Sequence, residues 1–406
     1  MASRFKIVTI FGTRPEIIKL YPVIRHLESR SESVSLTLGT GQQREMQAQM
    51  TNALDIHVDH DLGVMEEDQP LADLTSRLIT SLTRILSRIR PDMILVQGDT
   101  TTAFVAALTA FYLKMPVGHV ESGLRTGKKY LPFPEEINRK LITSLADIHF
   151  APTPGARLNL VRENVPESKI FITGNTVVDA MSIISDGING GRLKASPELE
   201  EIRGKTRDKK IVLVTGHRRE SFGKGLKNIC QALNGIVSKT PSAAVVYPVH
   251  PNPNVSLPVH RIIGNIPNIH LVKPLDYLSF VFLLNEAFMV LTDSGGIQEE
   301  AAALGKPTLI MREITERPEA VESGVAKLVG TKTESIRDNA LKLLRDRHFY
   351  DAMAAPSKVF GDGKAAEYIV DLCISFLKCD GRFIEKQYNP DNLQKVERLP
   401  TPPKTG

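Results

Sequence analysis

The stretch KIVTIFGTRPEIIKL, residues 6–20, joins an apolar run to a polar turn and then to a helical pattern. Residues 6–11 are mostly apolar, which is typical of a strand whose two faces are both buried. Gly12 ends this run, and Pro15 suits the first turn of a helix predicted over Glu16–Glu28. A buried strand followed directly by a helix is the unit from which parallel α/β sheets are built.

The same alternation continues along the first half of the chain. The predicted strands are Lys6–Phe11, Val34–Leu38, Met93–Gln97, Val117–Val120, Ile148–Ala151 and Ile170–Thr173. The predicted helices are Glu16–Glu28, Arg44–Leu54, Leu71–Ile89, Thr102–Lys114, Glu135–Leu145 and Gly155–Glu163. Within Leu71–Ile89, leucines and isoleucines recur at the 3.6-residue period of a helix. This half is therefore predicted to form a parallel sheet with helices on both sides.

The second half restarts the pattern after a charged segment, Lys194–Lys210, which is predicted to be a surface excursion without a strand. Strands are predicted at Ile211–Thr215, Ala243–Tyr247, Ile269–Val272, Phe288–Thr292, Thr308–Met311 and Ala326–Val329. Helices are predicted at Leu226–Ser238, Tyr277–Leu284, Gly296–Leu304, Glu334–Arg345 and Lys364–Lys378. Residues 387–406 are rich in proline and poor in apolar residues, so we expect a disordered tail. The pattern predicts two doubly wound Rossmann-like domains facing across a cleft, with ligands at the strand C-termini.

Composition bounds the class of protein. The 406 residues are 42% hydrophobic and 24% charged, which excludes collagen-like, wholly disordered and disulfide-stapled chains. No window approaches the roughly 18 apolar residues needed to span a bilayer, and no signal-peptide pattern is expected. Three cysteines without a CxxC pair favour a reducing cytoplasm. The net charge of +5 suits a small anionic substrate and is too dilute to favour nucleic acid.

Polar residues follow several predicted strands of the first half. Arg14 lies beside a helix N-terminus, which favours an anion site, although an ordinary solvent-facing turn is the plain alternative. Asp99 falls at a predicted helix N-cap, so capping alone would explain it. Glu121 directly follows its strand, and Glu135 opens a helix where we expect it to pair with Arg139 at i,i+4. Taken together, Asp99, Glu121 and Glu135 favour an acid/base set.

The second half places cationic and glycine-rich sequence at its strand ends. His217, followed by Arg218 and Arg219, forms a cluster suited to phosphate groups, and His250 stands alone after a later strand. Residues 292–300, TDSGGIQEE, predict a strand followed by a glycine-rich helix start, where backbone N–H groups can hold a diphosphate. Glu300 is placed to accept hydrogen bonds from a ribose.

Several common chemistries are disfavoured. The patterns GxGxxG, GxxxxGK[ST] and GxSxG do not occur in a suitable context. His57 and His60 lie near acidic residues, but no second ligand cluster accompanies them, so no metal site is expected. The residues by themselves indicate a two-domain α/β protein with a nucleotide-diphosphate cleft, one wall acidic and the other cationic and glycine-rich.

A set of longer motifs carries a family resemblance. FGTRPEIIK, GDTTT, GHVESGLRTG, PFPEEINR, ITGNTVVDA, VTGHRRESFG, YPVHPNPNV, LTDSGGIQEEA and ERPEAV closely resemble the non-hydrolysing UDP-N-acetylglucosamine 2-epimerase family. The resemblance covers about residues 5–375. It implies a GT-B-like architecture in which the C-terminal helix returns to the first domain. The implied domain limits are 1–173 plus 364–386 for the first domain and 174–363 for the second.

The resemblance also implies a reaction and its residues. Members interconvert UDP-GlcNAc and UDP-ManNAc without NAD or metal: the C2 proton is removed as UDP leaves, giving 2-acetamidoglucal, and UDP then adds back. The implied acid/base residues are Asp99, Glu121 and Glu135, with His217 assisting the departing diphosphate. Positions implied in UDP-sugar binding are Arg14, Lys19, Ser294, Gly295, Gly296, Glu300 and Arg317. A homodimer and the supply of UDP-ManNAc to cell-surface polysaccharide are implied as well.

The chain departs from the usual family pattern at two points. Gln43 stands where the family usually has a His, in a segment near which many bacterial members bind a second UDP-GlcNAc as activator. Gln42, Gln43 and His250 are the candidate residues for such an allosteric site, and the change at Gln43 puts activation in question. Ser122 replaces a usual Ala.

Three other functions stay open at this point. One is a 2-epimerase for a modified substrate such as UDP-2,3-diacetamido-glucuronic acid. Another is a GT-B glycosyltransferase, which would share the glycine-rich UDP site but needs an acceptor groove. The third is a UDP-sugar sensor, which would need none of Asp99, Glu121 or His217. Incubation with UDP-GlcNAc alone separates these functions.

Overall fold

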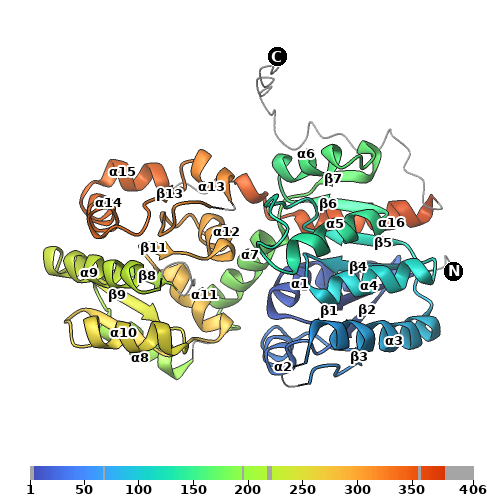
Figure 1. The fold of residues 1–406 in the computed structure, drawn as a ribbon, viewed down its shortest axis with the longest axis horizontal. Coiled ribbons are helices and arrows are strands. Elements are labelled where there is room, and N and C mark those ends of the chain that lie inside the picture. The colour runs from blue at the N-terminus through green and yellow to red at the C-terminus, as the bar shows by residue number, and fades with distance from the viewer. Residues whose placement is uncertain are drawn as a thin grey trace, which may run out of the picture.

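The computed structural model describes residues 4–66, 69–193, 196–216, 222–315, 317–354 and 358–379. These residues form two sheets that lie side by side (Figure 1). The first sheet has seven strands in the order β3-β2-β1-β4-β5-β6-β7, and the second has six in the order β10-β9-β8-β11-β12-β13. Every strand pair is parallel. Two doubly wound Rossmann-like domains, GT-B-like in architecture, are therefore confirmed.

The N-terminal domain, which is built on the first sheet, follows the predicted alternation closely. Its strands are β1 (Phe5–Phe11), β2 (Ser33–Gly39), β3 (His60–Asp61), β4 (Met93–Gln97), β5 (Val117–Val120), β6 (Ile148–Ala151) and β7 (Ile170–Ile172). Its helices are α1 (Arg14–Ser29), α2 (Arg44–Ala53), α3 (Leu71–Ile89), α4 (Thr101–Tyr112), α5 (Glu135–Leu145), α6 (Pro154–Arg162) and the 3₁₀ turn η1 (Glu167–Lys169). The short edge strand β3 was not predicted.

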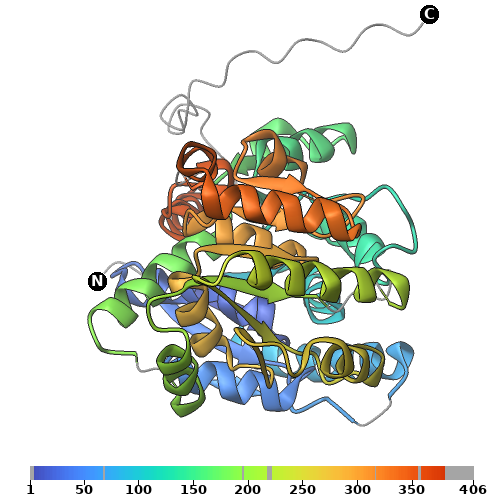
Figure 2. The ribbon, with the colours of Figure 1, turned by 90° about the vertical axis from the view of Figure 1, so that its left-hand side faces the viewer.

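The C-terminal domain is built on the second sheet. Its strands are β8 (Lys210–Thr215), β9 (Ala243–Pro248), β10 (Ile269–Val272), β11 (Met289–Thr292), β12 (Thr308–Ile310) and β13 (Ala326–Leu328). The remaining helices are α7 (Thr176–Asn189), α8 (Pro197–Lys205), α9 (Lys224–Lys239), α10 (Pro253–Ile263), α11 (Tyr277–Glu286), α12 (Gly295–Ala303), α13 (Pro318–Glu322), α14 (Thr333–Arg345), α15 (Arg347–Met353), the 3₁₀ turn η3 (Lys358–Phe360) and α16 (Ala365–Lys378). Figure 2 faces this domain, with α9 in yellow-green and α14 in orange over its sheet.

The sequence analysis did not predict some of the helices. The segment predicted to be a surface excursion contains α8, whose start is capped because Ser196 accepts a hydrogen bond from the backbone N–H of Leu199. Helix α10 contains Pro258 in its interior, where a proline normally argues against a helix. The expected disordered tail, residues 387–406, lies outside the described residues.

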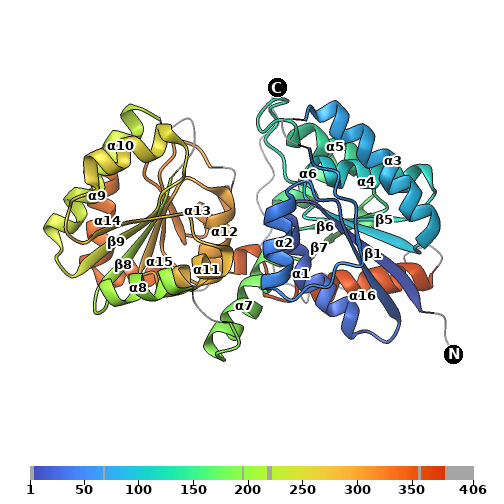
Figure 3. The same cartoon turned by 90° about the horizontal axis from the view of Figure 1, so that it is seen from below.

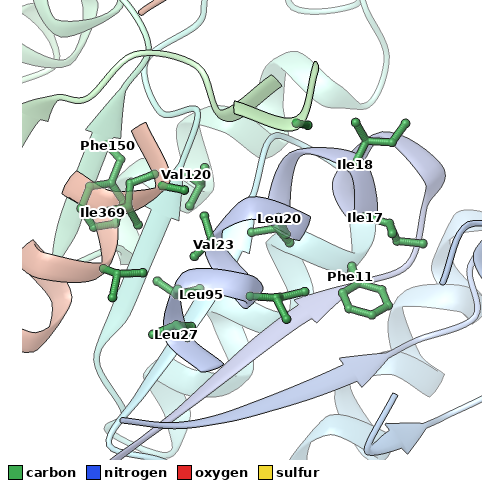
Figure 4. Packing of buried hydrophobic residues seen from close by; sticks show 14 of the residues in the cluster. Phe11, Ile17, Ile18, Leu20, Val23, Leu27, Leu95, Val120, Phe150 and Ile369 are labelled. Carbon is green, nitrogen blue, oxygen red and sulfur yellow. The ribbon is translucent and has the colours of Figure 1, made fainter. Parts of the chain in front are cut away.

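The core of the N-terminal domain depends on the last helix of the chain. Figure 3 shows α3, α4 and α5 on one side of the first sheet and α1 and α16 on the other. Helix α1 directs Leu20, Val23 and Leu27 into a buried cluster that also contains strand residues such as Val120 and, from α16, Ile369 (Figure 4). The return of α16 agrees with the predicted architecture, while the residue limits expected for the two domains stay a prediction.

The register of the first sheet brings the predicted site residues to one edge. Gln97 at the end of β4 lies beside Val120 at the end of β5, so the residues that follow them, Gly98 and Glu121, leave the sheet together.

Within the described residues, no helix is long and apolar enough to cross a membrane.

Replacing Ile369 by Ala is expected to lower the free energy of unfolding of the N-terminal domain by about 2–5 kcal/mol, because the side chain is fully buried. The measurement is urea unfolding followed by circular dichroism. The control is Lys378→Ala at the exposed end of the same helix, expected to change stability by no more than about 0.5 kcal/mol. Equal effects of the two substitutions would show that α16 does not belong to this core.

Candidate active site

A cavity of about 370 Å³ opens at the C-terminal ends of the central strands of the first sheet. It is lined by the three carboxylates predicted as an acid/base set, Asp99, Glu121 and Glu135. The other predicted site residues that line it are Lys19, Gln42, Gln43 and Arg317. Arg317, the residue before α13, belongs to the C-terminal domain, so both domains contribute to the cavity.

Glu121 is the carboxylate of the cavity that pairs with Lys19. It lies directly after β5 with φ of 63°, a left-handed conformation that is uncommon for a side chain of this type. Its carboxylate accepts hydrogen bonds from Lys19, from Gln97 and, at 2.9 Å, from Nδ2 of Asn175. Burial opposes ionisation, but the charges of Lys19 and Arg317 and these hydrogen bonds outweigh it and hold the pKa of Glu121 below its ordinary value. Glu121 is therefore an anion.

Glu299 on α12 extends this contact network into the C-terminal domain. Its carboxylate lies 3.5 Å from Nζ of Lys19 and pairs with the guanidinium of Arg317. Asn175 donates a second hydrogen bond to Glu299 at 3.2 Å. Two cations, two carboxylates and one amide thus form a buried cluster between the domains, which we call the interdomain cluster (Lys19, Glu121, Asn175, Glu299 and Arg317). Sequence reasoning missed Asn175, Glu299 and the Gln97 beside them.

Asp99 does not cap a helix, contrary to the sequence-based expectation. Helix α4 begins at Thr101, so the cap position falls on Thr100, whose hydroxyl accepts from the backbone N–H of Ala103 at 3.0 Å. The carboxylate of Asp99 instead pairs with Arg139 of α5 at 2.7 Å. Asp99 lies one residue before the cap position, so its carboxylate is available to Arg139.

Glu135 does not pair with Arg139, which corrects a second expectation. Arg139 is shared between Asp99 and, at 3.1 Å, Glu136. Among the described residues no hydrogen-bond partner lies at Oε2 of Glu135, although that oxygen is buried. Partial burial and then the negative charge of Asp99 raise the pKa of Glu135. Glu135 therefore holds a proton more readily than Glu121 does.

Glu16 is a further carboxylate of this cavity that the sequence did not single out as functional. Its Oε2 accepts from the backbone N–H groups of Gly12 at 2.9 Å and Thr13 at 2.7 Å, and its Oε1 accepts from Thr100 at 2.6 Å. Burial raises its pKa to about 7 in spite of these donors. Its position three residues after Thr13 is the signal that could have identified it, because this spacing is typical of a capping box.

Two buried histidines, His119 and His149, contact the residues that follow β4 and β5. Nε2 of His119 lies 2.8 Å from the carbonyl oxygen of Gly98, and Nδ1 of His149 lies 3.1 Å from Oγ of Ser122. Burial lowers the pKa of His119 to about 4 and that of His149 to about 3, so both are neutral at neutral pH. The unusual Ser122 is therefore accommodated by a hydrogen bond to a neighbouring strand.

The glycine-rich helix start lies on the C-terminal domain, outside the lining of the cavity. Gly295 is the first residue of α12, and a side chain added at Gly296 would meet open space. Oε1 of Glu300 accepts a hydrogen bond from the Tyr277 hydroxyl at 3.1 Å. Burial raises the pKa of Glu300 to about 7, and Arg14 of the other domain acts against this electrostatically.

Of the three residues predicted for an allosteric site, two line the cavity. Gln42 accepts from the Thr102 hydroxyl at 2.7 Å, and Gln43 accepts from the backbone N–H of Arg14 at 3.2 Å. His250 is exposed after β9, where its Nδ1 accepts from the backbone N–H of Asn252, and it does not line the same cavity. His217 lies outside the described residues. In the described part of the chain, no group of three or more His, Cys, Asp or Glu side chains could hold a metal ion.

The two facing Rossmann-like domains, with three carboxylates around a cavity at the strand ends of one and a glycine-rich helix start on the other, define a two-domain α/β protein of the class that binds ligands at the C-terminal ends of its strands. More particularly, the chain belongs to the UDP-N-acetylglucosamine 2-epimerase family, an isomerase family whose sequence model matches residues 25–373.

Individual relatives agree with this assignment over nearly the whole chain. The UDP-N-acetylglucosamine 2-epimerase of Salmonella typhimurium is 47% identical over 371 residues, which are 91% of this chain and 99% of that protein. The enzyme of the same name from Yersinia pestis is 50% identical over 370 residues, covering 90% and 97%. The crystal structure of UDP-GlcNAc 2-epimerase from Neisseria meningitidis bound to UDP-GlcNAc is 42% identical, with a TM-score of 0.83, covering 91% of this chain and 100% of that one.

Glu16 is expected to make stability depend on pH. Its pKa is 4.5 ordinarily and about 7 in the folded protein, so the folded state keeps a proton that the unfolded chain releases. The stability that this group contributes is therefore full below pH 4.5 and is lost as the pH rises to about 7. Replacing Glu16 by Gln removes this loss, so the variant gains stability relative to wild type across that window.

The measurement is the free energy of unfolding of both proteins between about pH 4 and about pH 8, a range that includes both pKa values of Glu16. Glu28→Gln, an exposed change near the end of the same helix, serves as the control and is expected to follow wild type. Parallel curves for wild type and Glu16→Gln would contradict the assignment.

Proposed function

We propose that this chain catalyses the reversible epimerisation at C2 of UDP-N-acetylglucosamine to UDP-N-acetylmannosamine, by elimination of UDP and its re-addition. The observation that carries the proposal is the convergence of Asp99, Glu121 and Glu135 on one cavity in a member of this family. The Neisseria meningitidis relative bound to UDP-GlcNAc supports the choice of substrate.

The chemistry explains why several carboxylates are needed. The C2 hydrogen of the sugar is not acidic, so its removal must be coupled to the departure of a stabilised leaving group. Breaking the C2–H and C1–O bonds yields 2-acetamidoglucal, UDP and a proton. Delivery of a proton to the opposite face of C2, with addition of UDP at C1, gives the epimer. Positioned proton donors and acceptors accelerate such steps by typically 10²–10⁴-fold.

The contrast between Glu121 and Glu135 supports a division of roles. Carboxylates whose surroundings move their pKa values in opposite directions are typical acid/base partners. Glu121, held as an anion by Lys19, is suited to accept the C2 proton, and Glu135, whose pKa is raised, is suited to supply one. Asp99 raises the pKa of Glu135 through its charge. The reverse reaction exchanges the two roles.

The UDP portion is proposed to lie between the domains. The N-terminus of α12 supplies backbone N–H groups for the diphosphate, and Lys19 and Arg317 supply positive charge from the two domains. Glu300 is proposed to accept from the ribose, with Arg14 nearby. The full set proposed for UDP-sugar binding is Arg14, Lys19, Ser294, Gly295, Gly296, Glu300 and Arg317, with His217 assisting the leaving diphosphate.

Gln42 and Gln43 are proposed to support the substrate cavity. Both line it, and both are held by partners within the N-terminal domain, Thr102 and the backbone of Arg14. His250 does not line this cavity. An allosteric site formed by Gln42, Gln43 and His250 stays a proposal.

The wider assignments are proposals as well. We propose domain limits of 1–173 plus 364–386 and 174–363, a homodimer, and a role in polysaccharide biosynthesis, as the family resemblance implies. The exposed Phe111 and Tyr112 at the end of α4 are candidates for the dimer contact. All three cysteines lie among the described residues and are free thiols, which supports a cytoplasmic location.

Pure protein incubated with UDP-GlcNAc in D₂O is expected to form UDP-ManNAc that carries deuterium at C2, because the hydrogen leaves as a proton. Proton NMR of the sugar pool measures both products and labelling. No acceptor is added, so a glycosyltransferase or a sensor would leave the substrate unchanged.

Other outcomes would redirect the proposal. Retention of the substrate hydrogen at C2 in UDP-ManNAc would defeat the elimination mechanism. Stoichiometric free ManNAc with UDP would move the protein to a hydrolysing class. Turnover of UDP-2,3-diacetamido-glucuronic acid with none of UDP-GlcNAc would favour the modified-substrate alternative.

The variants Asp99→Asn, Glu121→Gln and Glu135→Gln are each expected to lose about 10²–10⁴-fold in kcat, because each removes a proton carrier from the cavity. UDP binding, measured by calorimetry, is expected to persist in all three. Double variants are expected to be little worse than single ones, since residues that act as a unit are not additive. Glu167→Gln, an exposed carboxylate that pairs only with Arg157 among the described ion pairs, is the control. Near-normal turnover in all three variants would refute the assignment.

A further inference from the structure

The chain crosses between the two domains twice, and the crossings touch. The first crossing follows β7 and the second precedes α16. A Cβ added to Gly174 would lie 2.8 Å from the Cα of Gly361, and one added to Gly361 would lie 3.0 Å from the Cα of Gly174. Their φ angles are 87° and 120°, which only glycine adopts readily. The backbone N–H of Asn175 donates to the carbonyl of Phe360 at 2.6 Å. The two crossings therefore form one backbone-to-backbone junction.

Asn175 extends from this junction into the interdomain cluster. Its Oδ1 accepts from the backbone N–H of Val177 at 3.1 Å and so caps α7. Its Nδ2 donates to Glu121 at 2.9 Å and to Glu299 at 3.2 Å. Only 2% of the residue is exposed, so water does not supply these hydrogen bonds in its place.

We propose that Asn175 is a positioning residue, which holds Glu121 of the N-terminal domain and Glu299 of the C-terminal domain in a fixed geometry at the junction of the two chain crossings. The proposal deepens the proposed function, because it rests on the role of Glu121 in proton transfer. Asn175 does not line the cavity that holds the three carboxylates, so it acts through Glu121.

Asparagine fits this place better than its closest replacements. The position needs an acceptor for the helix cap and two N–H donors for two carboxylates, and the asparagine amide supplies all of these. Aspartate would keep the cap but would place a third carboxylate against Glu121 and Glu299. Serine would also keep the cap, but its short side chain would lose the donors.

The charged groups around Glu121 determine in which direction its pKa changes when Asn175 is replaced. Lys19 faces it from α1, Arg317 from the start of α13 and Glu299 from α12, while Asp99 and Glu135 line the same cavity. A hydrogen bond from Asn175 stabilises the ionised form of Glu121. Removing that donor therefore raises the pKa of Glu121, and adding a carboxylate at position 175 raises it further.

The test compares Asn175→Ser and Asn175→Asp with wild type. Both variants keep a good helix cap, so the melting temperature of Asn175→Ser is expected to stay closer to that of wild type, whereas Asn175→Asp buries a third carboxylate and is expected to melt at a lower temperature. We expect kcat to fall roughly 10- to 100-fold in Asn175→Ser, the loss typical of a hydrogen bond to a charged group, and to fall further in Asn175→Asp. The acidic limb of the pH profile of kcat is expected to move to higher pH in both, with KM changing less than kcat. Asp346→Asn, an Asp/Asn exchange at the N-cap of α15, is the matched control.

A direct measurement separates this proposal from the proposed function. The Glu121 carboxyl is titrated by ¹³C NMR of glutamate-labelled protein and assigned by the signal that Glu121→Gln removes. If wild type fails to epimerise UDP-GlcNAc and the pKa of Glu121 still rises in Asn175→Ser, the proposed function is wrong and the positioning role holds. Unchanged titration of Glu121 in both variants, or wild-type kcat and pH profile, would overturn the proposal. Should one variant fail to fold, the other decides.

Discussion

The interdomain cluster is the constraint on which the rest of the site depends. Lys19 and Arg317 bring two positive charges and Glu121 and Glu299 bring two negative ones into a place almost closed to water. Buried charges are tolerated only when each has a close partner, and removing one leaves the other uncompensated. Each domain supplies one cation and one anion, which pair with each other as Lys19 with Glu121 and Arg317 with Glu299. The contact of Glu299 with Lys19 at 3.5 Å joins the two pairs across the domain boundary. Asn175 donates to both carboxylates and so adds a second link across the same boundary.

The parallel sheet then determines what surrounds the cluster. Strands β1, β4 and β5 end at the same edge, so their following turns deliver Glu16, Asp99 and Glu121 to one cavity. The same burial acts differently on these carboxyls, because each meets a different set of partners. Glu121 meets cations and stays ionised, whereas Glu16 meets only neutral donors and has a pKa of about 7. One short stretch of sheet edge therefore holds carboxyl groups in different protonation states.

The fold could be predicted well from the sequence because its information is local. Apolar runs and 3.6-residue periods identified most strands and helices. Helix α10, which contains Pro258, was missed because it breaks a local rule, whereas α8 was missed although Ser196 caps it. The acids of the cavity were found because polar residues after buried strands stand out. Their partners were not found, because Arg139 chooses Asp99 only once α5 is docked, and Asn175 and Glu299 are 124 residues apart. Contacts of that kind belong to the tertiary structure.

The return of α16 has a consequence for how the protein is made. Residues 365–378 complete a hydrophobic cluster whose other members include Ile17 and Leu20, close to the opposite end of the chain. A ribosome therefore finishes the entire C-terminal domain before the N-terminal domain can close its core. During that interval α1 exposes one apolar face, and chains of this type are vulnerable to aggregation or need a chaperone to cover it. The rate of synthesis of the last part of the chain thus becomes a determinant of yield.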